Sequence, residues 1–173
     1  MQAIESLLPL AKAGHPEAAC AVANVFGQDD DPRVAVNEKL VKTLLLIVKS
    51  TVDKTVISGT RFIRRHMLMS LSNLAASEAN KALLCRHGAL NVIRQAALSP
   101  VGEDPHKQET DSFIAKCIWN LAFSDEVREK INADQELVNW LKTLQLRSLN
   151  ETARKNAAGA LFTLDQASNQ VCL

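Results

Sequence analysis

The sequence predicts an all-helical chain built from repeated units, and three observations carry this prediction. Apolar residues recur at spacings of three and four, as in Leu40, Leu44, Ile47 and Val48, which places them on one helical face. The 173 residues include only six glycines and five prolines, too few for the many tight turns of an all-β fold. Similar short segments also return at a nearly constant interval, which indicates a repeat.

The repeated segment is clearest at residues 69–75, 116–122 and 159–164, and a weaker copy lies at 21–25. Aligning these copies gives intervals of 49, 47 and 43 residues between equivalent positions, close to the ~40–47 residues of three-helix repeat units. The equivalent positions hold Asn24, Asn73, Asn120 and Thr163.

The helices follow from the apolar pattern between these copies. We expect helices over 2–13 and 15–26, one through the stripe at 40–48, then 77–87, 88–98, 125–133 and 135–146, and another through the apolar stripe at 114–121. Ser77 and Ser124 occupy N-cap positions. An acidic turn is expected at 27–32 and a long connection at 99–106.

We expect a single repeat domain over residues 1–173. Its approximate units are a partial one at 1–27, three full ones at 28–76, 77–124 and 125–166, and the start of a further one at 167–173. A helix with one apolar stripe cannot bury it alone, so neighbouring units must stack. In this register both ends are uncapped, and the chain is expected to belong to, or dock onto, something longer.

Charge and hydropathy argue against nucleic-acid binding, membrane insertion and secretion. Twenty Lys plus Arg against nineteen Asp plus Glu give a net charge of +1, without the basic excess of a nucleic-acid binder. No apolar run approaches the ~18 residues of a membrane helix, and residues 1–5 lack the basic start of a signal peptide. We therefore expect no nucleic-acid or membrane partner and a cytoplasmic location, with the nucleus as the alternative.

Motifs for catalysis or metal binding are missing from the sequence. The four cysteines are widely spaced, which favours reduced, buried thiols. The four histidines show no metal-binding spacing, and neither a GxSxG nor a phosphate-binding glycine motif occurs. We expect no cofactor, no metal and no enzymatic activity.

The segments Leu-Ser-Asn-Leu-Ala at 71–75, Cys-Arg-His-Gly-Ala-Leu at 85–90 and Ala-Ala-Gly-Ala-Leu at 157–161 resemble the armadillo family. The resemblance implies a right-handed α-solenoid of about three to four three-helix repeats, whose third helices line a concave groove. It also implies that asparagines at the positions of Asn24, Asn73 and Asn120 bind the backbone of an extended peptide. The alternative is that each Asn caps or bridges neighbouring helices, or is merely exposed.

Helical geometry predicts the rest of the groove, because residues four, seven and eight before each Asn share its side. The resulting side is mixed in polarity with a mild basic lean, which suits a partner of some acidic character. Cys20, Met69, Lys116 and Gly159 stand where nuclear-import adaptors of the family carry Trp, so a basic nuclear-localisation peptide is disfavoured. The predicted side comprises Arg65, His66 and Met69, then Ser112, Phe113 and Lys116, then Lys155, Asn156 and Gly159.

Three aromatic residues are open to two interpretations. Trp119 and Phe162 lie about 100° around the helix from the groove position, where they either anchor a partner at the rim or pack against the next unit. The packing interpretation is favoured, because apolar faces of stacked repeats must be buried. Trp140 is interpreted as a core residue beside Val138 and Leu141.

The sequence thus favours a scaffold that binds a protein or peptide segment, of unknown identity, along the third-helix groove. The first alternative is a regulatory or oligomerising arm of a larger signalling protein, because residues 153–162 resemble the last armadillo units before Toll/interleukin-receptor-type domains. The second is self-association through the uncapped ends of the repeat.

Overall fold

The computed structural model describes residues 2–26, 37–99 and 105–166, and these residues form an all-helical fold. The predicted helical class is therefore confirmed. No strand occurs in the described ranges apart from a single bridge between Ile57 and Thr60. The helices are α1 Gln2–Ala13, α2 Pro16–Phe26, α3 Glu38–Asp53, α4 Arg64–Leu74, α5 Glu78–Arg86, α6 Ala89–Leu98, α7 Lys107–Leu121, α8 Asp125–Ala133, α9 Gln135–Arg147 and α10 Glu151–Gln166.

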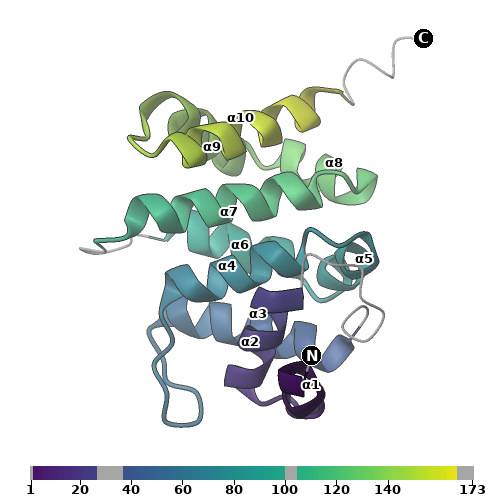
Figure 1. Ribbon diagram of the computed structural model, residues 1–173. Coiled ribbons are helices and arrows are strands. Elements are labelled where there is room, and N and C mark those ends of the chain that lie inside the picture. Colours follow the sequence, from purple (N-terminus) through teal and green to yellow (C-terminus); the bar gives the residue numbers. More distant parts are fainter. Residues whose placement is uncertain (1, 27–36, 100–104, 167–173) are drawn as a thin grey trace.

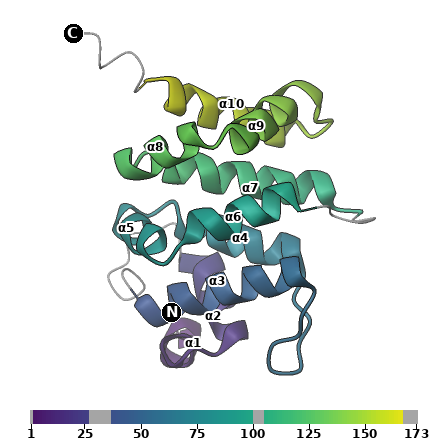
Figure 2. The ribbon, with the colours of Figure 1, turned by 180° about the vertical axis from the view of Figure 1, so that it is seen from behind.

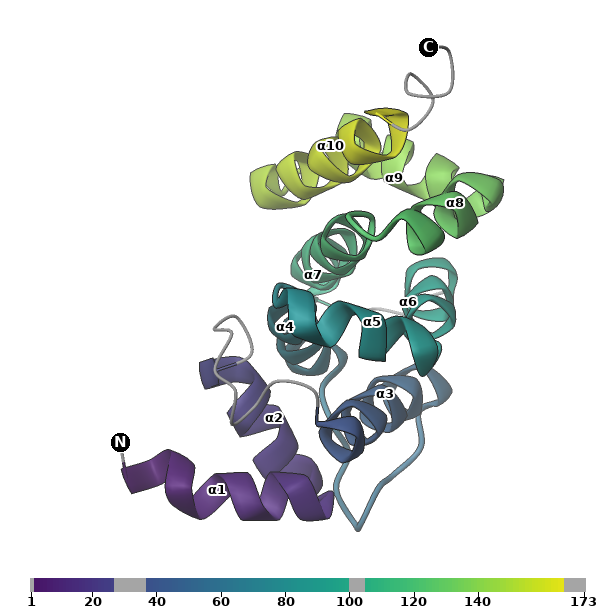
Figure 3. The ribbon, with the colours of Figure 1, turned by 90° about the vertical axis from the view of Figure 1, so that its right-hand side faces the viewer.

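The helices stack in two rows that climb from α1 to α10 (Figure 1). One row consists of α2, α4, α7 and α10, each packed against the next. The second row, α3, α6 and α9, lies behind the first and is seen from its outer side in Figure 2. Figure 3 shows the two rows side by side, with α2, α4, α7 and α10 on the left and α3, α6 and α9 on the right.

The short helices α5 and α8 connect the rows. α5 runs across the stack, side-on where α4 and α7 are seen end-on (Figure 3), and packs on α6 and α7. α8 packs on α9 and α10. Residues 77–124 and 125–166 therefore each contain two shorter helices followed by a longer one, in the order that the repeat predicts. The expected turn at 27–32, most of the connection at 99–106 and the segment 167–173 lie outside the described residues.

The core is aliphatic and fills the space between the two rows. Leu44, Leu71 and Ile118 are fully buried, as expected for the single apolar stripe of each helix. On α10 three of the buried residues are alanines, Ala153, Ala157 and Ala160, and their small side chains allow α10 to lie close to α7.

The two N-cap positions predicted from the sequence are correct, but side-chain capping hydrogen bonds are made at other helices. Ser77 and Ser124 do precede α5 and α8, but neither hydroxyl caps its helix. Instead, Asn37 caps α3 through Leu40 N–H at 2.9 Å, and Asp134 caps α9 through Leu137 N–H at 3.1 Å. Carboxylate and carboxamide oxygens satisfy the free amides of a first helical turn more strongly than most other side chains.

A short hairpin joins α3 to α4, which the sequence pattern did not predict. Its turn is Ser58-Gly59, where both residues have positive φ, 50° and 79°, flanked by reciprocal backbone hydrogen bonds between Ile57 and Thr60. Positive φ at both central positions is the geometry of a tight two-residue hairpin. Thr60 Oγ1 donates to Glu17 Oε1 on α2 at 3.3 Å, which ties the hairpin to the stack.

Candidate functional site

The outward sides of α2, α4, α7 and α10 are called here the third-helix face. This face is the surface that the repeat predicts as the binding groove, and its four helices lie side by side in the order of the chain. These four helices carry the residues predicted from the sequence, and the structure uses those residues in different ways. Some bridge neighbouring helices, and others remain open to solvent.

The repeated asparagines bridge adjacent helices. Asn73 Nδ2 donates to the backbone oxygen of Asn24 on α2 at 3.5 Å, and Asn120 Nδ2 donates to the backbone oxygen of Ser72 on α4 at 3.2 Å. Asn73 is only 7% exposed. This geometry matches the alternative that the sequence left open, in which each Asn side chain links one third helix to the preceding one.

Asn156 repeats the same device one helix further on. Its Nδ2 donates to both the backbone oxygen and Oγ of Ser112 on α7, at 3.0 and 3.2 Å. Asn156 and Ser112 are both buried, so neither presents a polar group to a partner. Asn24 is half-buried on α2, and its Oδ1 is buried without a hydrogen bond among the described residues.

The basic lean that the sequence predicts is smaller than the residue count implies. Arg65 Nη1 lies 2.6 Å from Glu109 Oε2 on α7 and 3.1 Å from His106 Nδ1, and its Nη2 lies 3.1 Å from His66 Nε2. This ion pair compensates the Arg65 charge and joins the first turns of α4 and α7. Lys155 is exposed but pairs with Glu151 on its own helix at 2.8 Å.

Trp119 lies between α7 and α10 and does not project from the rim. An added β-carbon on Gly159 of α10 would stand 2.6 Å from Trp119 Cε2, so the indole ring rests on the glycine backbone. Trp119 Nε1 donates to Thr163 Oγ1 at 3.2 Å, and Thr163 in turn donates to the Gly159 backbone oxygen at 2.9 Å. The packing interpretation of Trp119 is the one that this geometry supports. Phe162, by contrast, is 66% exposed.

A central strip of the third-helix face stays available to solvent. Met69 on α4 and Phe113 and Lys116 on α7 are half-buried, and His66 is exposed. Within the described residues, Lys116 makes no ion pair or hydrogen bond. Met69, Phe113 and Lys116 are called the central strip below. It combines apolar contact area with one uncompensated positive charge.

Nucleophilic and metal-binding groups are not assembled on this surface. Among the described residues, no three His, Cys, Asp or Glu side chains lie together as metal ligands would. Burial, aided by the charge of Glu17, raises the pKa of the Cys20 thiol to about 12, and burial also raises the pKa of Cys117. Because the thiolate is the reactive form, these two cysteines are poor nucleophiles.

Trp140 is more exposed than the core position that the sequence pattern predicts for it. Trp140 packs on the core with one side, yet it is half-buried and lines a surface pocket between α7 and α9. Its neighbours Val138 and Leu141 indicate a core position, and Trp140 does pack against the core. The pocket depends in addition on how α7 packs, and periodicity within one helix does not report this.

No protein-family model matches the chain, and no curated protein matches it significantly. No helix in the described part of the chain is long and apolar enough to cross a membrane.

Proposed function

We propose that this chain is an armadillo-type α-solenoid that binds a protein segment on its third-helix face and performs no catalysis itself. The observation that carries the proposal is the central strip, where Met69, Phe113 and Lys116 stay accessible although the helices around them are tightly bridged. A rigid surface with half-buried apolar side chains binds at a low entropic cost, because little must be ordered on association.

The chemistry of the central strip favours contacts with the side chains of a partner over hydrogen bonds to the partner's backbone. The Asn73 amide is buried and already donates to Asn24, so it is poorly placed to bind a peptide backbone. Met69 and Phe113 offer apolar area, and Lys116 offers an uncompensated ammonium group. We therefore infer a partner segment that carries both apolar and acidic side chains.

The test compares capture of partners by the immobilised wild-type chain with capture by a Phe113→Ser, Lys116→Glu double variant. A matched control is Glu129→Lys, which reverses an exposed charge on α8, away from the strip. If the strip is the binding site, the double variant should capture at most about a tenth as much of each partner as the wild type, which corresponds to a loss of ~1.4 kcal/mol of binding free energy. The control variant should capture as much as the wild type. Equal capture by all three folded proteins would overturn the proposal. Unfolding by urea, followed by circular dichroism, verifies that the variants are folded.

A second candidate function, an oligomerising arm, is favoured by a hollow over the last three described helices. A hollow of about 630 Å³ lies over α8, α9 and α10, and its apolar lining includes Val138, Leu161 and Phe162. Stacked repeats bury such faces against a further unit or a second copy. Light scattering at increasing protein concentration tests this alternative. If the hollow is an interface between copies, the mass of the wild type should rise with concentration, and a Phe162→Glu variant should remain monomeric.

A further inference from the structure

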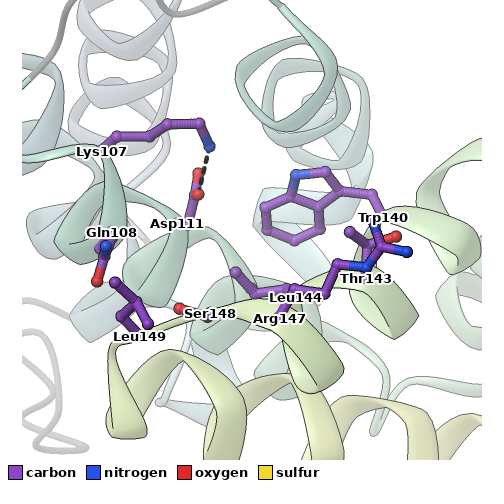
Figure 4. A pocket seen from close by; sticks show the side chains of 9 residues that line it. All are labelled: Lys107, Gln108, Asp111, Trp140, Thr143, Leu144, Arg147, Ser148 and Leu149. Atoms are coloured by element: carbon purple, nitrogen blue, oxygen red, sulfur yellow. Dashed lines mark hydrogen bonds and ion pairs between the residues drawn. The ribbon is translucent and has the colours of Figure 1, made fainter.

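A second surface pocket, away from the central strip, lies between α7 and α9 (Figure 4). It has a volume of about 450 Å³ and opens to solvent at the C-terminal end of α9. The side chains that line it are Lys107, Gln108, Asp111, Trp140, Thr143, Leu144, Arg147, Ser148 and Leu149.

The walls of this pocket are apolar. Trp140 forms the right-hand side of the pocket in Figure 4, with Leu144 below it and Leu149 on the opposite side. Leu149 is 83% exposed, so its aliphatic side chain is accessible at the edge of the pocket. Trp140 is half-buried, and its indole N–H donates no hydrogen bond within the described residues. Tryptophan is enriched at protein interfaces, because its ring offers a large apolar area and its N–H can donate a hydrogen bond to a partner.

The charges around the pocket are unbalanced toward positive. Lys107 and Asp111 neutralise each other through an ion pair of 2.5 Å, drawn as the dashed line in Figure 4. Arg147 is exposed and has no ion pair among the described residues. Arg154, whose Nη1 donates to the Ser148 backbone oxygen at 2.7 Å, adds a second positive charge beside the same rim. An occupant with a carboxylate would therefore complement the rim.

We propose that this pocket binds an acidic peptide segment of a partner protein, which inserts one bulky apolar side chain against Trp140 and places a carboxylate at Arg147. The pocket volume accommodates a phenylalanine or leucine side chain with part of its backbone. Arginine pairs well with carboxylates because its planar group donates two parallel hydrogen bonds. This site is independent of the third-helix face, since Lys107 and Asp111 lie on a different side of α7 from Phe113 and Lys116.

A single-stranded nucleic acid could also stack a base on Trp140 and place a phosphate at Arg147. The net charge of +1 for the whole chain disfavours it, because backbone neutralisation needs several cations in a track. Oligothymidine is therefore included in the test as a competing ligand.

The test uses the indole N–H signals of the ¹⁵N-labelled protein, of which there are two, from Trp119 and Trp140. A Trp140→Phe variant assigns them by the signal that it lacks. The probe is a blocked pentapeptide with one phenylalanine between two pairs of glutamates. We expect it to shift the Trp140 signal to saturation with a Kd below about 1 mM, while the Trp119 signal, bonded to Thr163, stays in place.

Two variants and two control probes decide the outcome. Arg147→Glu should weaken binding at least tenfold, and Lys49→Glu, the same charge reversal at an exposed position on α3, should leave it unchanged. Replacing the phenylalanine of the probe by alanine, or its glutamates by lysines, should abolish the shift. The proposal is overturned if the Trp140 signal does not move, if Arg147→Glu binds as wild type, or if oligothymidine binds more tightly than the peptide. An unmoved Trp119 signal in each variant verifies its fold.

Discussion

The indole ring of Trp119 on α7 rests on the backbone of Gly159 on α10, with the ring atom Cε2 only 2.6 Å from where a β-carbon would be. This contact is possible only because residue 159 has no side chain. Together with the Trp119 to Thr163 hydrogen bond, it fixes the distance between the last two helices of the first row. The glycine is therefore a packing element, although it lies within a helix, where glycine is normally unfavourable.

Replacing Gly159 by alanine should destabilise the protein, because the ring of Trp119 must move. Overpacking of this kind costs about 1–3 kcal/mol, which exceeds the gain of up to about 1 kcal/mol in helix propensity. In a Trp119→Ala background the same Gly159→Ala change should become stabilising, since only the propensity gain remains. Urea unfolding of the four proteins measures both effects, and an unchanged sign in the two backgrounds would show that the contact is not the cause.

The bridging asparagines should contribute to stability. Asn120→Ala removes the hydrogen bond to Ser72 and should lower the free energy of unfolding by about 1 kcal/mol. Asn73→Ala should cost a similar amount or somewhat more, because Asn73 is buried. Asn139→Ala on α9 is the control, since that side chain is exposed. Urea unfolding curves compare the three, and a cost for Asn139→Ala equal to the others would contradict the bridging role.

Asp134 should make stability depend on pH in the acid range. Burial alone would raise its pKa, but the Leu137 N–H and the Arg94 guanidinium, 2.5 Å away, outweigh burial and hold the pKa below 3.8. The native state is therefore stabilised above pH 3.8, and this contribution is lost as the pH falls through the lower native value.

An Asp134→Asn variant keeps the helix cap and removes the charge. At pH 6 the wild type should be more stable by less than about 1 kcal/mol, because the ion pair is partly exposed to water. Urea unfolding at pH 6 and at pH 3 tests this, with a shrinking difference expected at pH 3. A difference that is equal at both values would exclude the ion pair as its source.

The buried thiols should resist alkylation in the folded protein. Cys20 and Cys117 have raised pKa values because they are buried, so their thiolate forms are scarce at pH 8. Iodoacetamide followed by peptide mass spectrometry should find both unmodified until urea unfolds the chain, with half-buried Cys85 reacting at an intermediate rate. Rapid labelling of Cys117 in the native state would contradict its burial. Because the pKa of Cys20 is raised from 9.0 to about 12, stability should also decline as the pH rises above 9.

The sequence predicted the helices well because their signals are local. The helix expected at 125–133 is found at Asp125–Ala133, and the interval of 49 residues between Asn24 and Asn73 corresponds to a direct hydrogen bond between their helices. The hairpin at Ser58-Gly59 was not predicted, although a Ser-Gly dipeptide is a turn signal that could have indicated it.

The use of the individual side chains could not be predicted from periodicity. Helical spacing places Arg65, Asn73 and Asn156 on one side of their helices, but it does not report which neighbouring helix supplies Glu109, the Asn24 carbonyl or Ser112. Those partners lie 44 to 49 residues away and are set by how closely the rows pack. The proposed binding residues are therefore those that remain after the structural contacts are assigned.

The most direct test of the interaction function is photo-crosslinking from the third-helix face. A benzoylphenylalanine at position 113 replaces one aromatic side chain by another within the central strip. The control places the same group at exposed Glu129 on α8. We expect a partner protein to be crosslinked from position 113 and not from position 129 when the folded chain is irradiated in an extract of its source cells. Crosslinking from position 129 alone, or from neither position, would contradict binding on this face.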